Sequence, residues 1–425
     1  MIEKDFLPSK KKAYRMNRMR RKKMLTCVAL FVATALLSCK QPSAQSGFDL
    51  EGTLAWCHNQ VTGTLAELKA ADGGSINYSL TPRNIADGDT LWHRRTVSAE
   101  EWCAGFFPGI LWMDGMLSGD EEVLGEARAF SEAVSPMAHQ PAYDHDLGFI
   151  MLGSQGKGWE ATGDSTYLQL LLEAADTLAT LFNPTVGTIL SWPRHVNDFG
   201  GHNTIVDNLI NLELLFIAAA HSGDSSLYDM AVSHADVTMQ HQFLPDGTNC
   251  HVAIYDTLSG QFIRACTHQG YADGTMWARG QAWAIYGYTM IYRYTHEERF
   301  LRHACLCADH WLQRVPSDGV PYWDFDDPAI PDAPRDASAA AIVADALLEL
   351  CRYVPATDGE RYHAAATTAL ATLSSDPYRC TNGAHALLRH CVGNKPAGSE
   401  IDYSINYGDY YYLEALGRMK KVKKS

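Results

Sequence analysis

The sequence predicts an all-α protein folded as one (α/α)6 toroid, in which six inner helices are surrounded by six outer helices. One observation is a repeat: a short polar turn, such as Ser118-Gly119-Asp120, occurs five times, each time before an amphipathic segment. In these turns glycine or polar residues end one helix, and an acidic or hydroxyl residue begins the next. The other is that a strongly apolar segment precedes every turn. This alternation is typical of helical hairpins arranged in a ring.

The elements follow in order along the chain. Amphipathic periodicity over 50–69 predicts the first outer helix, and one further outer helix follows each turn. The segment 205–221 is apolar on nearly all sides, which requires burial in an inner helix. The predicted inner helices are 102–117, 146–161, 205–221, 279–294, 339–354 and 408–419.

The connections differ in length on the two sides of the predicted ring. Those that lead into the inner helices are long and rich in Gly, Pro, Trp and His, as at 183–204 and 242–278, whereas the outgoing turns are short. Long loops on a rigid scaffold usually carry function. We therefore expect the functional site at the N-terminal ends of the inner helices.

Two aspartates lie at such ends. Asp207 falls in the first turn of the helix expected over 205–221, and Asp146 begins the helix expected over 146–161. Helix capping is one interpretation, because Asp is favourable at an N-terminus. The other is a working pair that faces one central cavity, where two carboxylates hold different protonation states, as acid/base catalysis needs. Position alone leaves both interpretations open.

Aromatic and polar residues occupy the equivalent entrances to the other inner helices. Flat aromatic faces suit sugar rings, and a planar guanidinium suits a carboxylate. Core packing is the alternative for the tryptophans, above all for Trp283. These candidates are Trp102, Trp192, Arg279, Trp283 and, just before the fourth inner helix, Gln269.

Other chemistries lack their motifs. The chain has no GxSxG elbow, no HExxH and no P-loop, and the glycine run 153–158 falls in a helical stretch where it favours close packing or a break. His145, His195 and His202 show no tight ligand spacing, so we expect no metal and no cofactor. The cysteines beyond Cys39 form no CxxC pair, which signals neither a disulfide framework nor a zinc site.

The N-terminus reads as an export signal. Ten Lys and Arg residues precede the apolar run 24–37, which is too short for a permanent membrane helix and ends in Leu36-Leu37-Ser38-Cys39. That box resembles a bacterial lipoprotein cleavage site; an ordinary secretory peptide is the alternative. We expect a signal peptide at 1–38, a lipidated Cys39 with a tether to residue 47, and a single catalytic domain at 48–425.

This layout sets location and partners. We expect an exported lipoprotein of a Gram-negative bacterium, periplasmic or anchored at the outer membrane, that meets the membrane through its lipid alone. Removal of residues 1–38 would leave 25 Lys and Arg against 47 Asp and Glu. So acidic a protein is no nucleic-acid binder, and an anionic sugar would have to be held by local contacts. The sequence carries no signal for an oligomeric state.

Several ordered motifs make the chain resemble the unsaturated glucuronyl hydrolases, glycoside hydrolase family 88, over about residues 50–420. The family's (α/α)6 fold agrees with the helix count above. The motifs are Trp102-Cys-Ala-Gly-Phe-Phe-Pro-Gly-Ile-Leu-Trp112, His145-Asp-Leu-Gly-Phe149, Val206-Asp-Asn-Leu-Ile-Asn-Leu212, Gln269-Gly-Tyr-Ala-Asp273, Trp277-Ala-Arg-Gly-Gln-Ala-Trp-Ala-Ile-Tyr-Gly287 and Asn406-Tyr-Gly-Asp-Tyr-Tyr-Tyr-Leu-Glu-Ala-Leu416.

The resemblance implies a reaction. Such enzymes hydrate the C4=C5 double bond of the terminal uronate that polysaccharide lyases leave on an oligosaccharide, and the resulting hemiketal opens to release a keto acid. Asp207 is implied to protonate C4 and then, as a carboxylate, to help water add at C5. Asp146 matches the second essential aspartate, which holds sugar hydroxyls and keeps Asp207 protonated by charge repulsion.

The resemblance also implies the substrate contacts. Arg279 and Gln269 are expected near the uronate carboxylate and the water. Phe107 departs from relatives, which often carry Trp there, and this puts stacking at that edge in doubt. The remaining implied contacts are His145, Trp192, His251 and Trp283.

Two alternatives stay open. Unsaturated rhamnogalacturonyl hydrolases share fold and reaction but usually show Asp-Asp where this chain has Asp207-Asn208. A surface glycan-binding lipoprotein without catalysis is the other, against which the two carboxylates and Arg279 argue. We expect a glycosaminoglycan as the source of the substrate, with chondroitin, hyaluronan and heparin all open.

Overall fold

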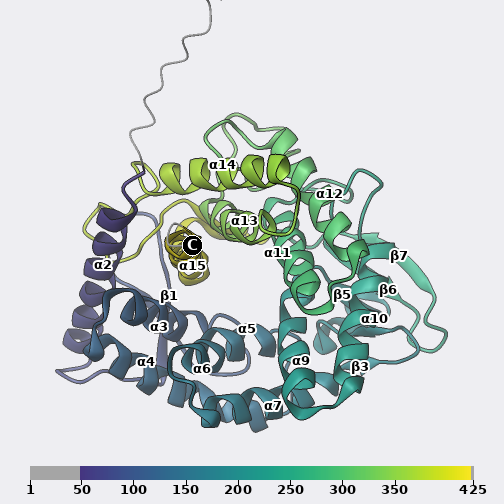
Figure 1. The fold of residues 1–425 in the computed structure, drawn as a ribbon, viewed down its shortest axis with the longest axis horizontal. Helices are drawn as coiled ribbons and strands as arrows, with labels where there is room; N and C mark the ends of the chain where they lie inside the picture. Colours follow the sequence, from purple (N-terminus) through teal and green to yellow (C-terminus); the bar gives the residue numbers. More distant parts are fainter. Residues whose placement is uncertain (1–47, 423–425) are drawn as a thin grey trace, which may run out of the picture. The chain divides into compact units, whose positions relative to one another are not determined.

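The computed structural model of the protein describes residues 48–422, and its helices form a closed ring (Figure 1). The outer helices are α2 (Leu50–Ala71), α4 (Glu121–Val134), α7 (Ser165–Ala179), α10 (Ser225–His241), α12 (Glu298–Arg314) and α14 (Ala356–Leu373). The inner ones are α3 (Phe106–Ser118), α5 (Leu147–Met151) continued by α6 (Lys157–Thr162), α9 (Asn208–Ser222), α11 (Ala278–Thr295), α13 (Ala337–Leu350) and α15 (Asn406–Val422). Within the described residues these are six inner and six outer helices, so the predicted (α/α)6 toroid is confirmed.

Three of the five polar turns have the predicted chemistry; Glu297 in the turn 295–297 makes no cap hydrogen bond, and 357–360, predicted as a turn, lies inside α14. In the turns 118–120, 162–164 and 222–224 the glycine is left-handed, with φ of 78°, 67° and 78°. Each following aspartate accepts a hydrogen bond from a backbone N–H in the first turn of the next outer helix. The glycine ends the inner helix and the carboxylate begins the outer helix, as the repeat indicates.

The inner helix expected over 146–161 is interrupted. Between α5 and α6 the chain makes a π-helical turn, η2 (Leu152–Gly156). A Cβ at Gly153 would lie 2.7 Å from the carbonyl oxygen of Gly105, immediately before α3. The glycine run therefore allows two backbones to touch, which agrees with the close packing predicted for it. The helix expected from residue 102 begins only at Phe106 for the same reason, because Gly105 has to meet this turn.

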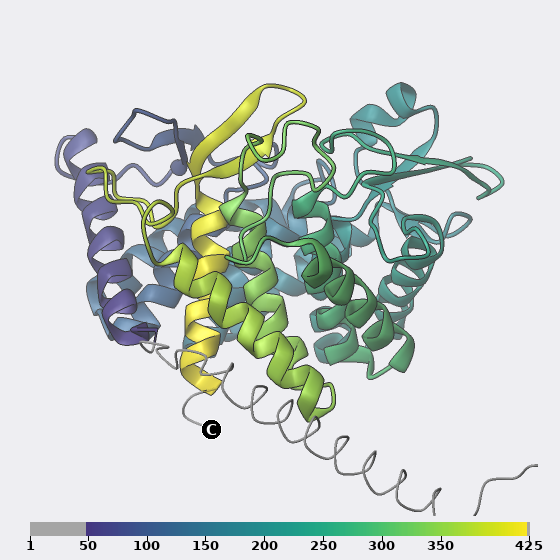
Figure 2. The same cartoon turned by 90° about the horizontal axis from the view of Figure 1, so that it is seen from above.

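The connections into the inner helices carry short strands that the sequence analysis does not predict. They lie at the end of the barrel where the inner helices begin, here called the entry end (Figure 2). One antiparallel sheet has the order β2-β1-β9-β8 and another the order β5-β6-β7. The connections into the inner helices also carry the short helices η1 (Ser135–His139), η3 (Pro193–His195) and α8 (Val196–Phe199). The strands are β1 (Leu80–Ile85), β2 (His93–Thr96), β3 (Phe182–Asn183), β4 (Thr188–Ile189), β5 (His202–Ile205), β6 (Val252–Tyr255), β7 (Phe262–Cys266), β8 (Cys391–Asn394) and β9 (Ser399–Ile405).

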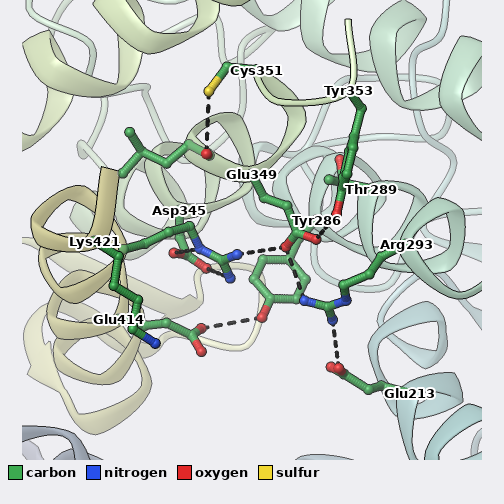
Figure 3. A network of polar contacts seen from close by, with 12 residues as sticks. Glu213, Tyr286, Thr289, Arg293, Asp345, Glu349, Cys351, Tyr353, Glu414 and Lys421 are labelled. Carbon is green, nitrogen blue, oxygen red and sulfur yellow. Dashed lines mark hydrogen bonds and ion pairs between the residues drawn. The ribbon is translucent and has the colours of Figure 1, made fainter. Parts of the chain in front are cut away.

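Where the inner helices terminate, here called the far end, a network of ion pairs joins them (Figure 3). Arg418 of α15 bonds Asp345 and Glu349 of α13, both at 2.8 Å. Arg293 of α11 bonds Glu213 of α9 at 2.6 Å and also Glu349 at 3.2 Å. A cavity of about 960 Å³ opens beside the network. Each arginine is shared between two carboxylates, so the network ties α9, α11, α13 and α15 together and its cations are not available to an anionic ligand.

The first helix also starts at the far end. Because outer helices run antiparallel to inner ones, α2 begins beside the last turns of α15, where Lys420 Nζ lies 3.1 Å from Glu51 Oε2. Among the described residues, no helix combines the length and apolar character that crossing a bilayer requires. The predicted signal peptide, Cys39 and the tether lie outside the described residues.

Candidate active site

A pocket of about 200 Å³ opens at the entry end, above the starts of α5, α9 and α11. This is the place that the long connections predict. Most of the candidates named from the sequence meet in it, together with residues from the intervening loops. Its lining consists of Trp102, Asp146, Trp192, Arg194, His195, Ile205, Asp207, His268, Gln269 and Arg279.

The two aspartates are not helix caps. Asp146 and Asp207 occupy the N-cap positions of α5 and α9, yet neither side chain accepts a cap hydrogen bond. Both side chains are 13% exposed. Oδ2 of Asp207 is buried and has no hydrogen-bond partner within the described part of the chain. The capping interpretation is therefore wrong for both. Their carboxyl oxygens are not used by the helix N-termini and are available to a substrate.

Both carboxyl groups bind protons more tightly than usual. Burial raises the pKa of Asp207 to about 6, while the charge of Arg279 and the nearby indole of Trp283 act in the opposite direction. The pKa of Asp146 lies well above its ordinary value, first through burial and then through the charges of Asp144 and Asp207. Burial, rather than charge repulsion from Asp146, is thus the cause of the Asp207 shift.

A neutral histidine faces each aspartate, and backbone groups set its tautomer. His145 is fully buried, which lowers its pKa, and its Nδ1 must donate to the carbonyl oxygen of Ser191 at 2.9 Å. Its Nε2 therefore carries a lone pair, which lies 3.3 Å from Oδ1 of Asp146. This arrangement favours a proton on Asp146.

His251 has the opposite tautomer. Its Nδ1 accepts hydrogen bonds from the backbone N–H groups of Gln269, at 3.1 Å, and His268, at 3.3 Å. Burial holds its pKa well below the usual value, so the single ring proton is on Nε2, 3.7 Å from Oδ2 of Asp207. An N–H facing Asp207 favours its ionised form. Before substrate binds, Asp146 therefore holds its proton more tightly than Asp207, whose pKa is about 6.

Arg279 is placed to bind an anion. Its guanidinium is stacked on Trp277 at 4.6 Å and donates to the carbonyl oxygen of Gly393 at 2.6 Å and to Oε1 of Gln269 at 3.3 Å. It also donates to the carbonyl oxygen of Val392. Gln269 and Arg279 are thus brought together, as expected for the recognition of a carboxylate.

The remaining candidates form the wall behind the pocket. Trp102 and Trp192 line it directly. Trp283 is fully buried against Phe149 and Tyr411, so it packs as core while its indole N–H points toward Asp207. The residue at position 107 does not belong to this aromatic wall. Phe107 packs on Phe130 and does not line the pocket.

Unsatisfied polar atoms gather at this site. Buried polar atoms in proteins nearly always have a partner, so a cluster without partners indicates a place where a ligand supplies them. Among the described residues, the buried atoms without a hydrogen bond here are His145 Nε2, Asp207 Oδ2, His251 Nε2 and Trp283 Nε1.

Sequence reasoning missed one charged neighbour, Asp144. Asp144 accepts from Arg194 at 2.8 Å. The ligand atoms of Asp144, His145 and Asp146 lie within 4.8 Å of one another. Arg194 already supplies the positive charge that a metal ion would bring to this cluster. Asp144 adjoins the His145 motif, and that adjacency was the one available clue.

Sequence reasoning also missed a charged pair that supports the aromatic wall. Arg83 of β1 lies 5.3 Å from the ring of Trp102 and bonds both oxygens of Glu400 of β9 at 2.9 Å. Strands β8 and β9 thereby hold two guanidinium groups, Arg83 through Glu400 and Arg279 through the carbonyl oxygens of Val392 and Gly393. No motif marks either Arg83 or Glu400 in the sequence.

Most of the chain matches one known protein family. Residues 99–421 match the model of Glycosyl Hydrolase Family 88. The chain belongs to this family. The family 88 match spans the pocket and all inner helices, and it confirms the resemblance read from the ordered motifs.

Relatives in family 88 cover most of the chain. An unsaturated glucuronyl hydrolase of Formosa agariphila is 43% identical over 346 residues, which are 80% of this chain and 85% of that protein. An unsaturated chondroitin disaccharide hydrolase of Streptococcus pyogenes is 32% identical over 76% of this chain and 82% of its own length. A solved unsaturated glucuronyl hydrolase specific for heparin has a TM-score of 0.79 and 39% identity, covering 87% of this chain and 98% of that one.

Proposed function

We propose that this glycoside hydrolase removes the unsaturated uronate from oligosaccharides that polysaccharide lyases produce, by hydrating its C4=C5 double bond. The observation that carries the proposal is the placement of Asp207, with a pKa of about 6, in one small pocket with Arg279. A proton donor with a pKa near the working pH suits general acid/base catalysis. A buried guanidinium suits the uronate carboxylate.

In the proposed reaction, Arg279 first binds the uronate carboxylate. The bound anion neutralises the charge that lowers the pKa of Asp207, so Asp207 takes up its proton when substrate arrives. That proton moves to C4, and positive charge develops at C5 and the ring oxygen. Water adds to C5 and returns a proton to the Asp207 carboxylate. The hemiketal then opens, releasing the shortened saccharide and a keto acid.

Asp146 has a different proposed role. With its proton directed toward the lone pair of His145, it is a neutral group that donates to or accepts from sugar hydroxyls. Trp102 and Trp192 supply flat faces along the pocket for the sugar ring.

Asn208 favours this reaction over the rhamnogalacturonyl alternative. Its side chain is fully buried and donates to the carbonyl oxygen of Ile189 at 3.2 Å and to Oγ of Ser191 at 3.3 Å. An aspartate at this position would face an acceptor that it could not satisfy when ionised. The site is thus built for the Asp-Asn pair.

The direct test is turnover of defined substrates. Protein lacking residues 1–39 should bleach the ultraviolet absorbance of unsaturated disaccharides from chondroitin, hyaluronan or heparin, because hydration removes the double bond. A panel that differs only in sulfate position identifies the preferred substrate. Binding without bleaching of any disaccharide would establish the glycan-binding alternative instead.

We also propose that the protein is exported and anchored through a lipid on Cys39. The basic stretch, the short apolar run and the box ending in Cys39 support this. Expression of the full chain with labelled palmitate should give a labelled membrane-associated protein. Cys39→Ala should abolish the label, whereas Cys27→Ala, a cysteine within the expected signal peptide, should leave it unchanged.

A further inference from the structure

The positive charge of Arg279 has to be balanced without water. Its side chain is 3% exposed. Its hydrogen-bond acceptors, the carbonyl oxygens of Val392 and Gly393 and the amide oxygen of Gln269, are all neutral. Neutral acceptors satisfy the N–H groups but leave the charge. A buried guanidinium of this kind needs an anion nearby.

Asp336, at the N-cap of α13, stands next to it. Its Oδ1 accepts from the backbone N–H groups of Ser338 at 3.0 Å and Val392 at 3.3 Å, which begins the helix and fixes β8. Its Oδ2 is buried, has no hydrogen bond from any described residue, and lies 3.7 Å from Nη1 of Arg279. One oxygen therefore serves the fold, and the other is directed at the charge of Arg279.

Apart from Asp207 itself, no other carboxylate among the described residues is equally free to do this. Glu400 also acts on Arg279, but both of its oxygens are bonded to Arg83 at 2.9 Å. Val392 links the pair further, because its N–H binds Asp336 and its carbonyl oxygen binds Arg279. Asp336 and Arg279 thus form one unit built across α11, α13 and β8.

The charge of this unit reaches the proton donor. Arg279 lowers the pKa of Asp207, so any anion that offsets Arg279 weakens that pull. The other groups that face Asp207 are His251, Trp283 and Asp146. The groups that face Asp336 besides Arg279 are the thiol of Cys391 and the hydroxyl of Tyr407. None of these other groups carries a positive charge at neutral pH.

We propose that Asp336 is a positioning residue whose free carboxylate oxygen is the counter-charge of Arg279. It thereby limits how strongly Arg279 favours the deprotonated form of Asp207. This inference rests on the proposed function, in which Asp207 must be protonated for turnover to begin. It assigns a role in the reaction to a residue that lies outside the pocket and touches no substrate.

The test is the pH profile of Asp336→Asn. The amide oxygen still caps α13, while the counter-charge is lost. The basic limb of kcat/KM should move down by about one pH unit, which is about a tenfold loss at a pH above the limb. KM should not rise, since Arg279 keeps its charge and its carbonyl partners. A purely structural role predicts the reverse: a higher KM with an unmoved limb.

Asp409→Asn is the matched control. Asp409 is also a buried aspartate near the start of an inner helix, bonded to the N–H groups of Leu387 at 2.9 Å and Leu388 at 2.8 Å, with no cation partner among the described residues. Its removal should leave the limb in place. An equal shift in both variants, or no shift in Asp336→Asn, overturns the proposal.

Asp336→Ser supports the same test if the Asn variant does not fold, because Ser is also a good N-cap and carries no charge. If neither charge-free variant folds, Asp336 serves the fold alone and the proposal is overturned. Wild-type turnover is measured first. A wild type that bleaches no unsaturated disaccharide refutes the proposed function, whereas an active wild type with an unshifted variant refutes only the role of Asp336.

Discussion

At the far end of the barrel, Arg418, Asp345 and Glu349 are bonded to one another, whereas at the entry end Asp207 keeps a buried oxygen without a partner among the described residues. The far end also has the larger cavity, about 960 Å³ against about 200 Å³. Cavity size would select the wrong end. What marks the reacting end is its cluster of four buried polar atoms without a hydrogen-bond partner among the described residues, against one, Arg293 Nε, in the far-end network.

The same contrast applies to aspartates at helix starts. Asp164 and Asp224 accept backbone hydrogen bonds at outer helices, which lowers their pKa. Asp146 and Asp207 stand at the same kind of position on inner helices, accept no such bond, and have a raised pKa. Residue type and helix position are equal in the two sets, so burial and pairing decide the chemistry.

Asp207→Asn should have the largest effect. We expect kcat to fall by about 10³-fold or more, because the amide cannot supply the proton. The fold should gain stability above pH 6, since the ionised carboxyl costs folding free energy when its pKa is raised from near 3.8 to about 6. That gain is about 3 kcal/mol at most and should vanish below pH 4. Turnover assays and denaturant unfolding at several pH values measure both; wild-type turnover would exclude the acid role.

Arg418→Met should lower the stability of the fold and leave the activity unchanged. Removing this cation leaves Asp345 and the shared Glu349 without it, so unfolding should become easier by about 3–5 kcal/mol, while kcat/KM stays within about twofold. Arg361→Met is the control, because Arg361 and its partner Asp309 are 43% and 41% exposed and their pair should contribute under about 1 kcal/mol. A loss of activity in folded Arg418→Met protein would contradict the assignment of the two ends.

The pH dependence should show Asp207 as the acid. Deprotonation of a group with a pKa of about 6 removes the active form, so kcat/KM should fall about tenfold per unit on the basic side. In kcat the limb should lie at higher pH, because bound uronate neutralises Arg279 and raises the pKa of Asp207. Identical limbs in kcat and kcat/KM would argue against this coupling. A solvent-accessible Asp207 would place both near pH 4.

An outer cap should have the smallest effect. Asp224→Ala removes the acceptor for the N–H of Ser226 and should slightly lower the thermal stability without changing turnover. Asp224→Asn, which retains a capping oxygen, should be close to wild type in thermal unfolding. A change in kcat/KM for either variant would show that the outer turns are coupled to the pocket.

The sequence predicted the elements that local chemistry determines. The Gly-Asp turns and the apolar segments define both helix layers, because helix capping and helix burial depend on residues that are close together in the sequence. For the glycine run at η2 the sequence left close packing and a break as alternatives, since the outcome depends on the contact between Gly153 and Gly105. The short strands also escaped, because they form only where the barrel holds two loops side by side.

The site divides in the same way. Asp207, Asp146 and Arg279 were predictable because each starts an inner helix and belongs to an ordered motif. Asp336 and Arg83 were not, because their importance comes from what they touch across the fold, Arg279 and Trp102. Trp283 shows the intermediate case: the sequence left core and site as alternatives, and its buried ring with an N–H toward Asp207 serves both.

The start of α2 beside the end of α15 has a consequence for an anchored protein. Leu50 begins α2 at the end of the barrel opposite the pocket, where Glu51 pairs with Lys420. A lipid on the proposed Cys39 would thus be attached at the end away from the pocket and would leave its mouth uncovered. Saccharides would then reach it from the surrounding fluid without passing along the bilayer, and its product would leave in the same direction.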